Sequence, residues 1–308
     1  MKNIRIIFMG TPLIACDYFK VLIENKYNVI AIFTQPPRKK GRGMNLQQSP
    51  VHDESLKHNI PVFHPINLRE QKNIDLFIRL KADLVIVMAY GLLLPKEILE
   101  APKYGCINIH LSLLPRWRGA APIEHALLNG DEKTGVTIFR LVNKLDSGPI
   151  ISSKFLKIEN DMDKNDLTLK LNQIGKKLLI NSLSNYINNQ ITLINQNDND
   201  ATYAHKIHSG DRKIDFSSSV DDVYNKVKAF SPNPSAWCVI GKENIKIIKC
   251  KKKHIESLPS IIVNDKFHLG CKDGLIEPLI VQREGKKPMN INEFLKGFHF
   301  IVGQKINA

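Results

Sequence analysis

Short apolar runs, each followed by a turn-forming or polar residue, recur along the first third of the chain. Ile4–Met9 leads into Gly10, and Val29–Phe33 and Leu84–Ala89 repeat the pattern with helix-like stretches between them. Strands and helices that alternate in this way predict a mostly parallel, Rossmann-like sheet with crossover helices. Sheets of this class bind ligands at the carboxyl ends of their strands, so functional side chains are expected there.

The last hundred residues have a different pattern. A helix-like stretch at 220–230 precedes five short β-like runs, at 236–240, 245–250, 260–263, 267–271 and 275–281. Lys272-Asp273-Gly274 is typical of a hairpin turn, and so many short strands predict a small barrel. The amphipathic stretch 163–187 predicts a long helix that covers the first sheet. We therefore expect a first domain at 1–188, a linker at 189–204 and a second domain at 205–308.

The chain is strongly basic, with 44 Lys and Arg against 30 Asp and Glu and a net charge of +14. Residues 201–308 carry 18 basic and 11 acidic side chains, so this part is the more basic per residue. One interpretation is contact with a polyanion such as RNA. The other is a lysine-rich solvated surface, since Lys, Asn and Ile are abundant throughout.

Several classes of protein are disfavoured by the sequence. No apolar run approaches the roughly 20 residues that cross a bilayer, and the N-terminal run is too short for a signal peptide, so we expect no membrane contact. Five scattered cysteines without a Cys-x-x-Cys pair indicate reduced thiols and a cytoplasmic protein. No metal-ligand spacing occurs, and the glycines at 10, 41 and 43 match neither a dinucleotide fingerprint nor a P-loop. We expect no metal.

A polar segment at 106–123, reading CINIHLSLLPRWRGAAPI, carries the strongest functional signal. Asn108 and His110 are two residues apart, so on a strand their side chains point to the same face. An amide donor and a titratable ring would then meet at a strand end. The alternative is that these polar residues only cap a loop. Asp146 leaves the same choice open, because Asp-Ser-Gly alone is typical of a plain turn.

Together these motifs resemble the enzymes that transfer formyl groups from 10-formyltetrahydrofolate, and among them the methionyl-tRNA formyltransferases. The resemblance rests on Asn108-x-His110, Ser112-Leu113-Leu114-Pro115, Arg116-Trp117-Arg118-Gly119-Ala120-Ala121-Pro122-Ile123 and Leu145-Asp146-Ser147-Gly148. Further matches lie at 8–12, 33–36, 89–95 and 202–204. Leu111 departs from the family's usual Gly, Ala or Pro, and Pro37 from its common acidic residue.

The resemblance implies a formyltransferase catalytic domain followed by an OB-like barrel that binds tRNA. It implies 10-formyltetrahydrofolate as the formyl donor and methionyl initiator tRNA as the acceptor. The catalytic residues it assigns are Asn108, His110 and Asp146. The folate-binding residues it assigns are Ser112, Leu113, Leu114 and Pro115, with Tyr90, Gly91 and Leu92 as a wall.

The side chains suit formyl transfer, in which an amine attacks a formamide-like carbonyl through a tetrahedral oxyanion. The Asn108 amide can donate to the oxyanion. His110 can act as an acid or base, or as a charged donor to the same oxygen. Asp146 would orient the imidazole or hold a proton-relaying water. The amine attacks directly, so no enzyme nucleophile is needed.

The segment Thr34–Ser49 contains two prolines, two glycines and four cations, and we expect no regular element in it. It is either a solvated insertion or a basic finger that reaches phosphates. In the family a matching loop lies against the acceptor stem, which makes Lys39, Lys40 and Arg42 predicted tRNA contacts. Arg116 and Arg118 are further predicted contacts, with surface cations packed on Trp117 as the alternative.

Three rival functions share parts of this pattern. They are a formyltransferase with a small amine substrate, a tRNA-binding protein on an inactive scaffold, and a formyl-folate hydrolase. The basic loop, the Arg-Trp-Arg segment and the basic barrel favour the tRNA enzyme over the first and third. Intact Asn108, His110 and Asp146 argue against the second. Nothing indicates a repeated interface, so we expect a monomer.

Overall fold

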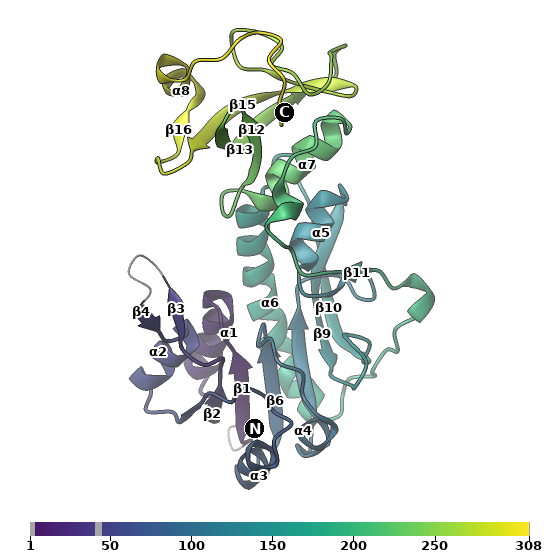
Figure 1. The fold of residues 1–308 in the computed structure, drawn as a ribbon. Helices are drawn as coiled ribbons and strands as arrows, with labels where there is room; N and C mark the ends of the chain where they lie inside the picture. The colour runs from purple at the N-terminus through teal and green to yellow at the C-terminus, as the bar shows by residue number, and fades with distance from the viewer. Residues whose placement is uncertain (1–3, 41–44, 308) are drawn as a thin grey trace. The chain divides into compact units, whose positions relative to one another are not determined.

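The computed structural model of the chain describes residues 4–40 and 45–307, apart from the side chain of Lys40. Arg42, a predicted tRNA contact, lies outside the described residues. The chain divides into two compact units (Figure 1). The first comprises 1–118, 135–156 and 171–203, and the second 119–134, 157–170 and 204–308. Each unit is thus built from several stretches of chain, and the domain limits at 188 and 205 stay a prediction.

A seven-stranded sheet forms the first unit, in the order β10-β9-β7-β6-β1-β2-β5. Its strands are β1 (Ile6–Gly10), β2 (Val29–Phe33), β5 (Val62–Phe63), β6 (Leu84–Met88), β7 (Cys106–His110), β9 (Lys133–Arg140) and β10 (Ile150–Lys157). From β5 to β7 neighbouring strands pair in parallel, whereas β9 runs antiparallel to β7. β1 and β6 are buried along their whole length, as central parallel strands covered on both faces must be. The predicted α/β class is confirmed.

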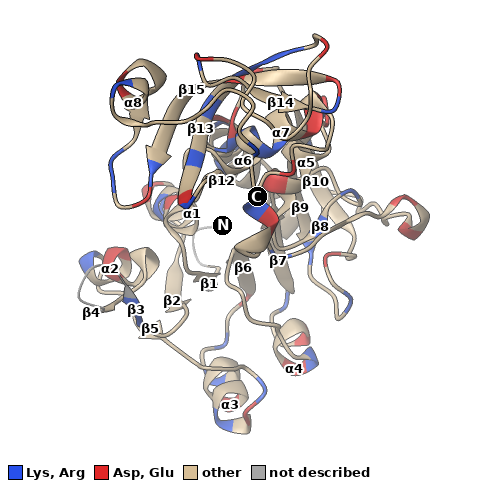
Figure 2. Ribbon diagram, turned by 45° about the horizontal axis from the view of Figure 1, so that its top comes forward, with Lys and Arg blue, Asp and Glu red and all other residues tan. Residues whose placement is uncertain are grey.

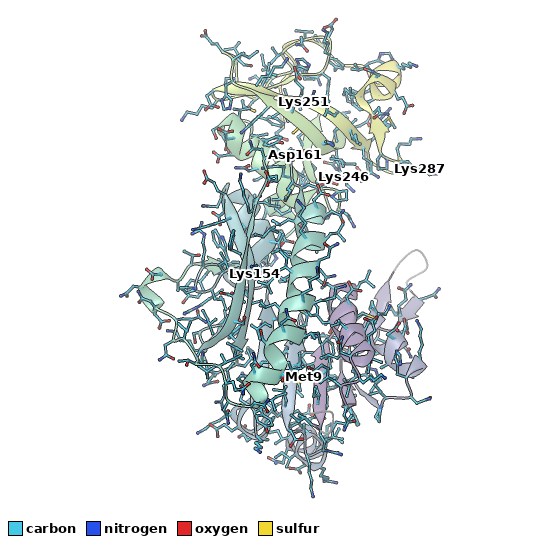
Figure 3. The ribbon with its side chains drawn as sticks, turned by 180° about the vertical axis from the view of Figure 1, so that it is seen from behind. Met9, Lys154, Asp161, Lys246, Lys251 and Lys287 are labelled. Carbon is cyan, nitrogen blue, oxygen red and sulfur yellow. The ribbon has the colours of Figure 1, made fainter. Side chains whose placement is uncertain are left out.

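Helices cover this sheet. They are α1 (Leu13–Glu24), α2 (Pro50–Lys57), α3 (Gln71–Arg79), α4 (Lys96–Glu100) and the long α6 (Lys164–Ile187). Leu179, Leu183 and Tyr186 are spaced on one face of α6 and lie against the isoleucines of β7, β9 and β10. Figure 3 shows α6 running along the sheet. The helix predicted at 163–187 is therefore confirmed, and its apolar face closes one side of the core.

A small hairpin stands where no regular element was expected. β3 (Arg38–Lys40) pairs antiparallel with β4 (Asn45–Gln47), so the expectation for Thr34–Ser49 is wrong at these residues. The two prolines precede the paired residues, which keeps the backbone N–H groups of β3 available for pairing. The ends of the segment are tied together, because the hydroxyl groups of Thr34 and Ser49 lie 2.7 Å apart. Ser49 then caps α2 by accepting from the N–H of His52.

An antiparallel barrel forms most of the second unit. Its strands are β12 (Ala236–Ile240), β13 (Glu243–Lys253), β14 (Leu269–Cys271), β15 (Gly274–Arg283) and β16 (Met289–Asn290). The sheet order is β12-β13-β15-β14, with β16 on β15. Isolated bridges Leu269–Ile262, Ile261–Lys305 and Ile306–Ile240 then link β14 back to β12 and close the ring. The predicted run at 260–263 contributes only these bridges. The predicted small barrel is confirmed.

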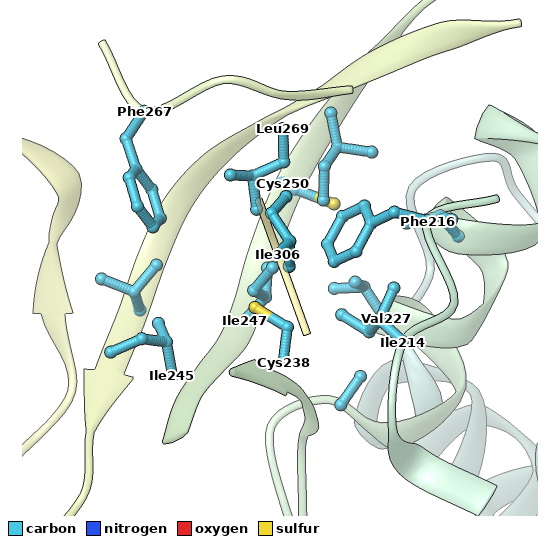
Figure 4. Packing of buried hydrophobic residues seen from close by; sticks show 14 of the residues in the cluster. Ile214, Phe216, Val227, Cys238, Ile245, Ile247, Cys250, Phe267, Leu269 and Ile306 are labelled. Carbon is cyan, nitrogen blue, oxygen red and sulfur yellow. The ribbon is translucent and has the colours of Figure 1, made fainter. Parts of the chain in front are cut away.

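The barrel encloses an apolar core. Figure 4 shows Phe216, Cys238, Ile247, Leu269 and Ile306 packed together in this cluster. The helices α5 (Pro122–Leu128), α7 (Val220–Phe230) and α8 (Ile291–Gly297) belong to the same unit. The remaining short elements of the chain are β8 (Arg118–Gly119), which pairs with β11 (Tyr203–Ala204), and the 3-10 turns Asp198–Asp200 and Gly210–Arg212.

Lysines recur along the barrel strand β13, which carries several of the positions coloured blue in Figure 2. Lys249, Lys251, Lys252 and Lys253 are all exposed along it. Within the described part of the chain, no helix combines the length and the apolar character needed to cross a membrane.

Candidate active site

Polar residues follow neighbouring strands of the first sheet where each reaches its carboxyl edge. Thr11 follows β1, Gln35 lies beyond β2, and Tyr90 lies beyond β6. The Thr11 hydroxyl and the Gln35 amide both donate to the carbonyl oxygen of Tyr90, at 3.3 and 3.1 Å. Three strand ends are therefore hydrogen-bonded together. They hold in place the segment that begins at Tyr90, which is one wall of the predicted folate site.

Asn108 and His110 lie on β7, and strand alternation places both side chains on one face, as predicted. Pairing fixes their positions, because Asn108 is opposite Phe139 and His110 opposite Thr137 on β9. The Asn108 side chain is half-buried, and no hydrogen bond to it occurs among the described residues. His110 is only 5% exposed. An amide that can donate therefore lies beside a buried imidazole.

The His110 ring is held between two acceptors. Its Nε2 lies 2.7 Å from the carbonyl oxygen of Trp117, and since only an N–H can pair with a carbonyl, Nε2 carries the proton of the neutral ring. Nδ1 lies 3.9 Å from Oδ2 of Asp146, longer than a hydrogen bond but close enough for strong attraction between charges. The ring edge also packs against Phe139.

Burial sets the charge of this ring. It lowers the pKa of His110 below the ordinary value of 6.5, because a charged imidazolium loses its hydration there. The Asp146 carboxylate and the Trp117 carbonyl act in the opposite direction and raise the pKa. His110 is therefore mainly neutral at pH 7, with an unprotonated Nδ1 that faces a carboxylate.

Asp146 lies in the turn between β9 and β10. Its φ is +45°, and its side chain is 11% exposed. Gly148 is required in this turn, since a Cβ there would lie 1.7 Å from the carbonyl oxygen of Arg140. The amide of Gln196 donates to the carbonyl oxygens of Asp146 and Gly148, at 2.9 and 2.8 Å. The Leu-Asp-x-Gly turn is thus a fixed support for the carboxylate.

The predicted folate residues form a tight turn directly after β7. Thr137, the partner of His110, donates to the carbonyl oxygen of Ser112 at 2.7 Å and accepts from the N–H of Leu114 at 3.1 Å. The buried Ser112 hydroxyl donates to the carbonyl oxygen of Arg116 at 2.6 Å, so it shapes the turn through the backbone. Leu113 and Pro115 are half-buried.

On the predicted wall, Tyr90 is buried, Leu92 is half-buried and Gly91 is exposed. The Tyr90 hydroxyl is buried and has no hydrogen-bond partner in the described part of the chain. Within that part, no group of three or more His, Cys, Asp or Glu side chains is arranged to hold a metal ion.

The predicted tRNA contacts have different surroundings. Lys39 is exposed on β3. Arg116 is half-buried and lies 4.5 Å from the ring centre of Trp117. Arg118 is fully buried, and its guanidinium donates to Gln196 and to Asp198. This burial counts against a direct phosphate contact by Arg118.

Gln196 is a residue of the site that the sequence alone does not reveal. It stands in an Asn-, Gln- and Asp-rich stretch that predicts a linker, and no local pattern distinguishes it from its neighbours. Its partners, Arg118 and the turn at Asp146, are far away in the sequence. Only the folded chain brings them together.

The fold is of the α/β class, and its candidate site combines an amide, a buried imidazole and a carboxylate. Two sequence models match the chain: one described as Formyl transferase over residues 2–183, and one described as Formyl transferase, C-terminal domain, over residues 206–299. The chain belongs to the formyl transferase family, and it is an enzyme of that class.

Relatives similar to the chain along its length carry the name methionyl-tRNA formyltransferase. The relative from Wolbachia sp. subsp. Drosophila simulans (strain wRi) is 44% identical over 293 residues, which cover 95% of this chain and 96% of the relative. The relative from Brucella melitensis biotype 2 is 40% identical over 298 residues, covering 95% and 97%.

Solved structures share the fold at lower identity. WlaRD, a sugar 3N-formyl transferase crystallised with dTDP and 5-N-formyl-THF, has a TM-score of 0.64 at 20% identity, covering 92% of this chain and 99% of its own. HypX from Aquifex aeolicus, in complex with tetrahydrofolic acid, has a TM-score of 0.64 at 14% identity, covering 98% of this chain and 51% of its own. At these identities the similarity establishes the fold.

Proposed function

We infer that the chain transfers a formyl group from 10-formyltetrahydrofolate to the amino group of methionine on initiator tRNA. The observation that carries this conclusion is the 40–44% identity to methionyl-tRNA formyltransferases over 95% of the chain, through both formyl transferase regions. The carboxyl-edge placement of Asn108, His110 and Asp146 supports the same chemistry.

The proposed reaction begins when the methionine amine attacks the formyl carbon. A C–N bond forms, the carbonyl electron pair moves to oxygen, and the Asn108 amide donates a hydrogen bond to that oxyanion. The proton that leaves the amine goes to Nδ1 of His110. The resulting imidazolium donates from Nε2 to the Trp117 carbonyl and faces the Asp146 carboxylate from Nδ1, so both ring nitrogens face acceptors.

Collapse of the intermediate completes the transfer. The bond between the formyl carbon and the folate nitrogen breaks, and the proton held by His110 passes to that nitrogen. The products are formylmethionyl-tRNA and tetrahydrofolate. His110 returns to its neutral form, which burial favours. One imidazole therefore serves as base and then as acid.

We propose that folate is held between the turn at 112–115 and the segment at 90–92. The half-buried apolar side chains of Leu92, Leu113 and Pro115 suit a flat heteroaromatic ring. Tyr90 itself packs into the apolar core of the first unit, so it supports this wall from behind. The donor supplies the formyl group, and the chain supplies orientation and proton transfer.

We propose tRNA contacts at exposed Lys39 and at Arg116 beside the active site, with Lys40 and Arg42 retained from the sequence prediction. Exposed Lys249 and Lys251 of β13 support RNA binding by the barrel, since phosphate contacts dominate such affinity, whereas Lys252 and Lys253 on the same strand are paired with carboxylates. We also propose a cytoplasmic, monomeric enzyme. The compartment is supported by five cysteines that are all free and buried.

Replacing His110 with alanine tests the assignment of chemistry. We expect His110→Ala to abolish formylation of methionyl initiator tRNA while its dissociation constant for tRNA stays within a few-fold of wild type, because the proposed phosphate contacts are made by other residues. Lys154→Ala, an exposed change on β10 (Figure 3), is a matched surface control. Full transfer by His110→Ala would contradict the mechanism.

A further inference from the structure

The segment that follows α6 contacts both groups that flank His110. Gln196 holds the turn that carries Asp146. Thr202 holds the other side, since its hydroxyl oxygen accepts from the N–H of Trp117 at 2.9 Å, and the Trp117 carbonyl is bound by His110. A stretch that the sequence predicts to be a linker therefore contacts the backbone of the site at two points.

Gln196 uses its entire carboxamide in this arrangement. Its two N–H groups donate to the carbonyl oxygens of Asp146 and Gly148. Its Oε1 accepts from Nε and Nη2 of Arg118, at 3.0 and 2.8 Å. An amide has two donor hydrogens and two acceptor lone pairs, so every position is filled.

Arg118 determines which way that amide points. A guanidinium can only donate, so the oxygen of Gln196 must face Arg118 and its N–H groups must face the turn. Arg118 is itself fully buried and donates from Nη1 to Asp198 at 2.8 Å. The Arg118 N–H is bound by the carbonyl of Thr202 at 2.9 Å. The orientation of the carboxamide is thus set from outside the turn.

We propose that Gln196 is a positioning residue for the reaction, whose carboxamide, oriented by buried Arg118, holds the Asp146 carboxylate against Nδ1 of His110. The proposal rests on the proposed function for the role of His110. Gln196 does not touch the imidazole, and its effect passes through the backbone of residues 146 and 148.

Gln196→Glu tests the proposal with little change in size. A carboxylate still accepts from Arg118, but it cannot donate to two carbonyl oxygens and repels them instead. We expect kcat to fall by about 10- to 100-fold, less than complete loss of the Asp146 charge would cost, with the KM for tRNA nearly unchanged. Asn195→Asp makes the same amide-to-acid change at the exposed neighbouring residue and should leave kcat unaltered.

A double-mutant comparison separates positioning from a purely structural role. If Gln196 acts through the carboxylate, Gln196→Glu should cost almost nothing further in a protein that already carries Asp146→Asn. Additive losses, with a lowered melting temperature as the only other effect, would overturn the proposal. If Gln196→Glu does not fold, Gln196→Met removes the same donors without adding a charge.

A direct readout on the ring does not depend on tRNA. In protein labelled with ¹⁵N-histidine, the His110 signals are those absent from His110→Gln. We expect Gln196→Met, which adds no charge, to move the His110 titration to lower pH, because the carboxylate that raises this pKa is displaced. An unchanged titration would overturn the positioning role. Absence of formylation by the wild-type enzyme would instead count against the proposed function.

Discussion

The strongest quantitative prediction concerns the charge of Asp146. Replacing it with asparagine keeps the shape and removes the carboxylate that faces the His110 imidazolium at 3.9 Å. Two unit charges at that distance attract by about 4 kcal/mol at an effective dielectric constant near 20, and by about half as much if water penetrates. The His110 and Asp146 side chains are only 6% and 11% exposed, so the attraction is not fully screened.

That free energy converts into a rate. If the imidazolium forms in the transition state, losing about 2–4 kcal/mol slows transfer by about 30- to 1000-fold. Loss of the Asp146 charge should also change the pH dependence of the reaction.

The base must be neutral, so kcat/KM rises with pH through the His110 pKa, which burial holds below 6.5. Asp146 raises that pKa, so Asp146→Asn should shift the acidic limb to still lower pH.

The assay is formylation of methionyl initiator tRNA between pH 5 and 8, with the folate saturating and the tRNA well below its KM, so that the rate reports kcat/KM. Asp161→Asn, the same change on an exposed carboxylate of the second unit, is the control (Figure 3). A fall in rate of less than about threefold together with an unmoved acidic limb would refute the pairing of Asp146 with a charged His110.

Three further predictions follow from the same geometry. Asn108→Ala should lower kcat by about 100- to 1000-fold, the usual cost of losing one oxyanion donor. The melting temperature should be nearly unchanged, because the side-chain amide has no partner among the described residues. Normal turnover would remove Asn108 from the site. Arg118→Met should reduce the free energy of unfolding in urea by about 2–4 kcal/mol, since it removes a buried, hydrogen-bonded guanidinium, whereas Arg116→Met should cost far less. Lys39→Ala should raise the KM for tRNA several-fold and make tRNA binding less sensitive to salt, without changing the KM for the folate. An unaltered salt dependence of tRNA binding would argue against a phosphate contact by Lys39.

The sheet and the barrel were largely predictable from local patterns. Parallel strands buried on both faces need continuous apolar runs, and β2 is present at the residues predicted for it. The hairpin β3–β4 was not predictable in this way. Its pairing depends on backbone hydrogen bonds that composition does not reveal, and its prolines suggested an irregular loop.

The candidate site was predictable only in part. Asn108 and His110 are two residues apart on a strand, so their shared face follows from geometry alone. The burial of Arg118 could not be predicted in this way, because the local sequence, an arginine next to a tryptophan, is typical of a surface cation. Its partners Gln196 and Asp198 lie about 80 residues later in the chain. Side chains whose partners are distant in sequence carry no local signal.

The acceptor of the formyl group is identified by offering labelled 10-formyltetrahydrofolate to the purified enzyme, with methionyl initiator tRNA and free methionine as parallel acceptors. We expect labelled formylmethionyl-tRNA and no transfer to free methionine. Equal transfer to both acceptors would contradict a tRNA enzyme, and absence of product on either, with tRNA still bound, would identify an inactive scaffold.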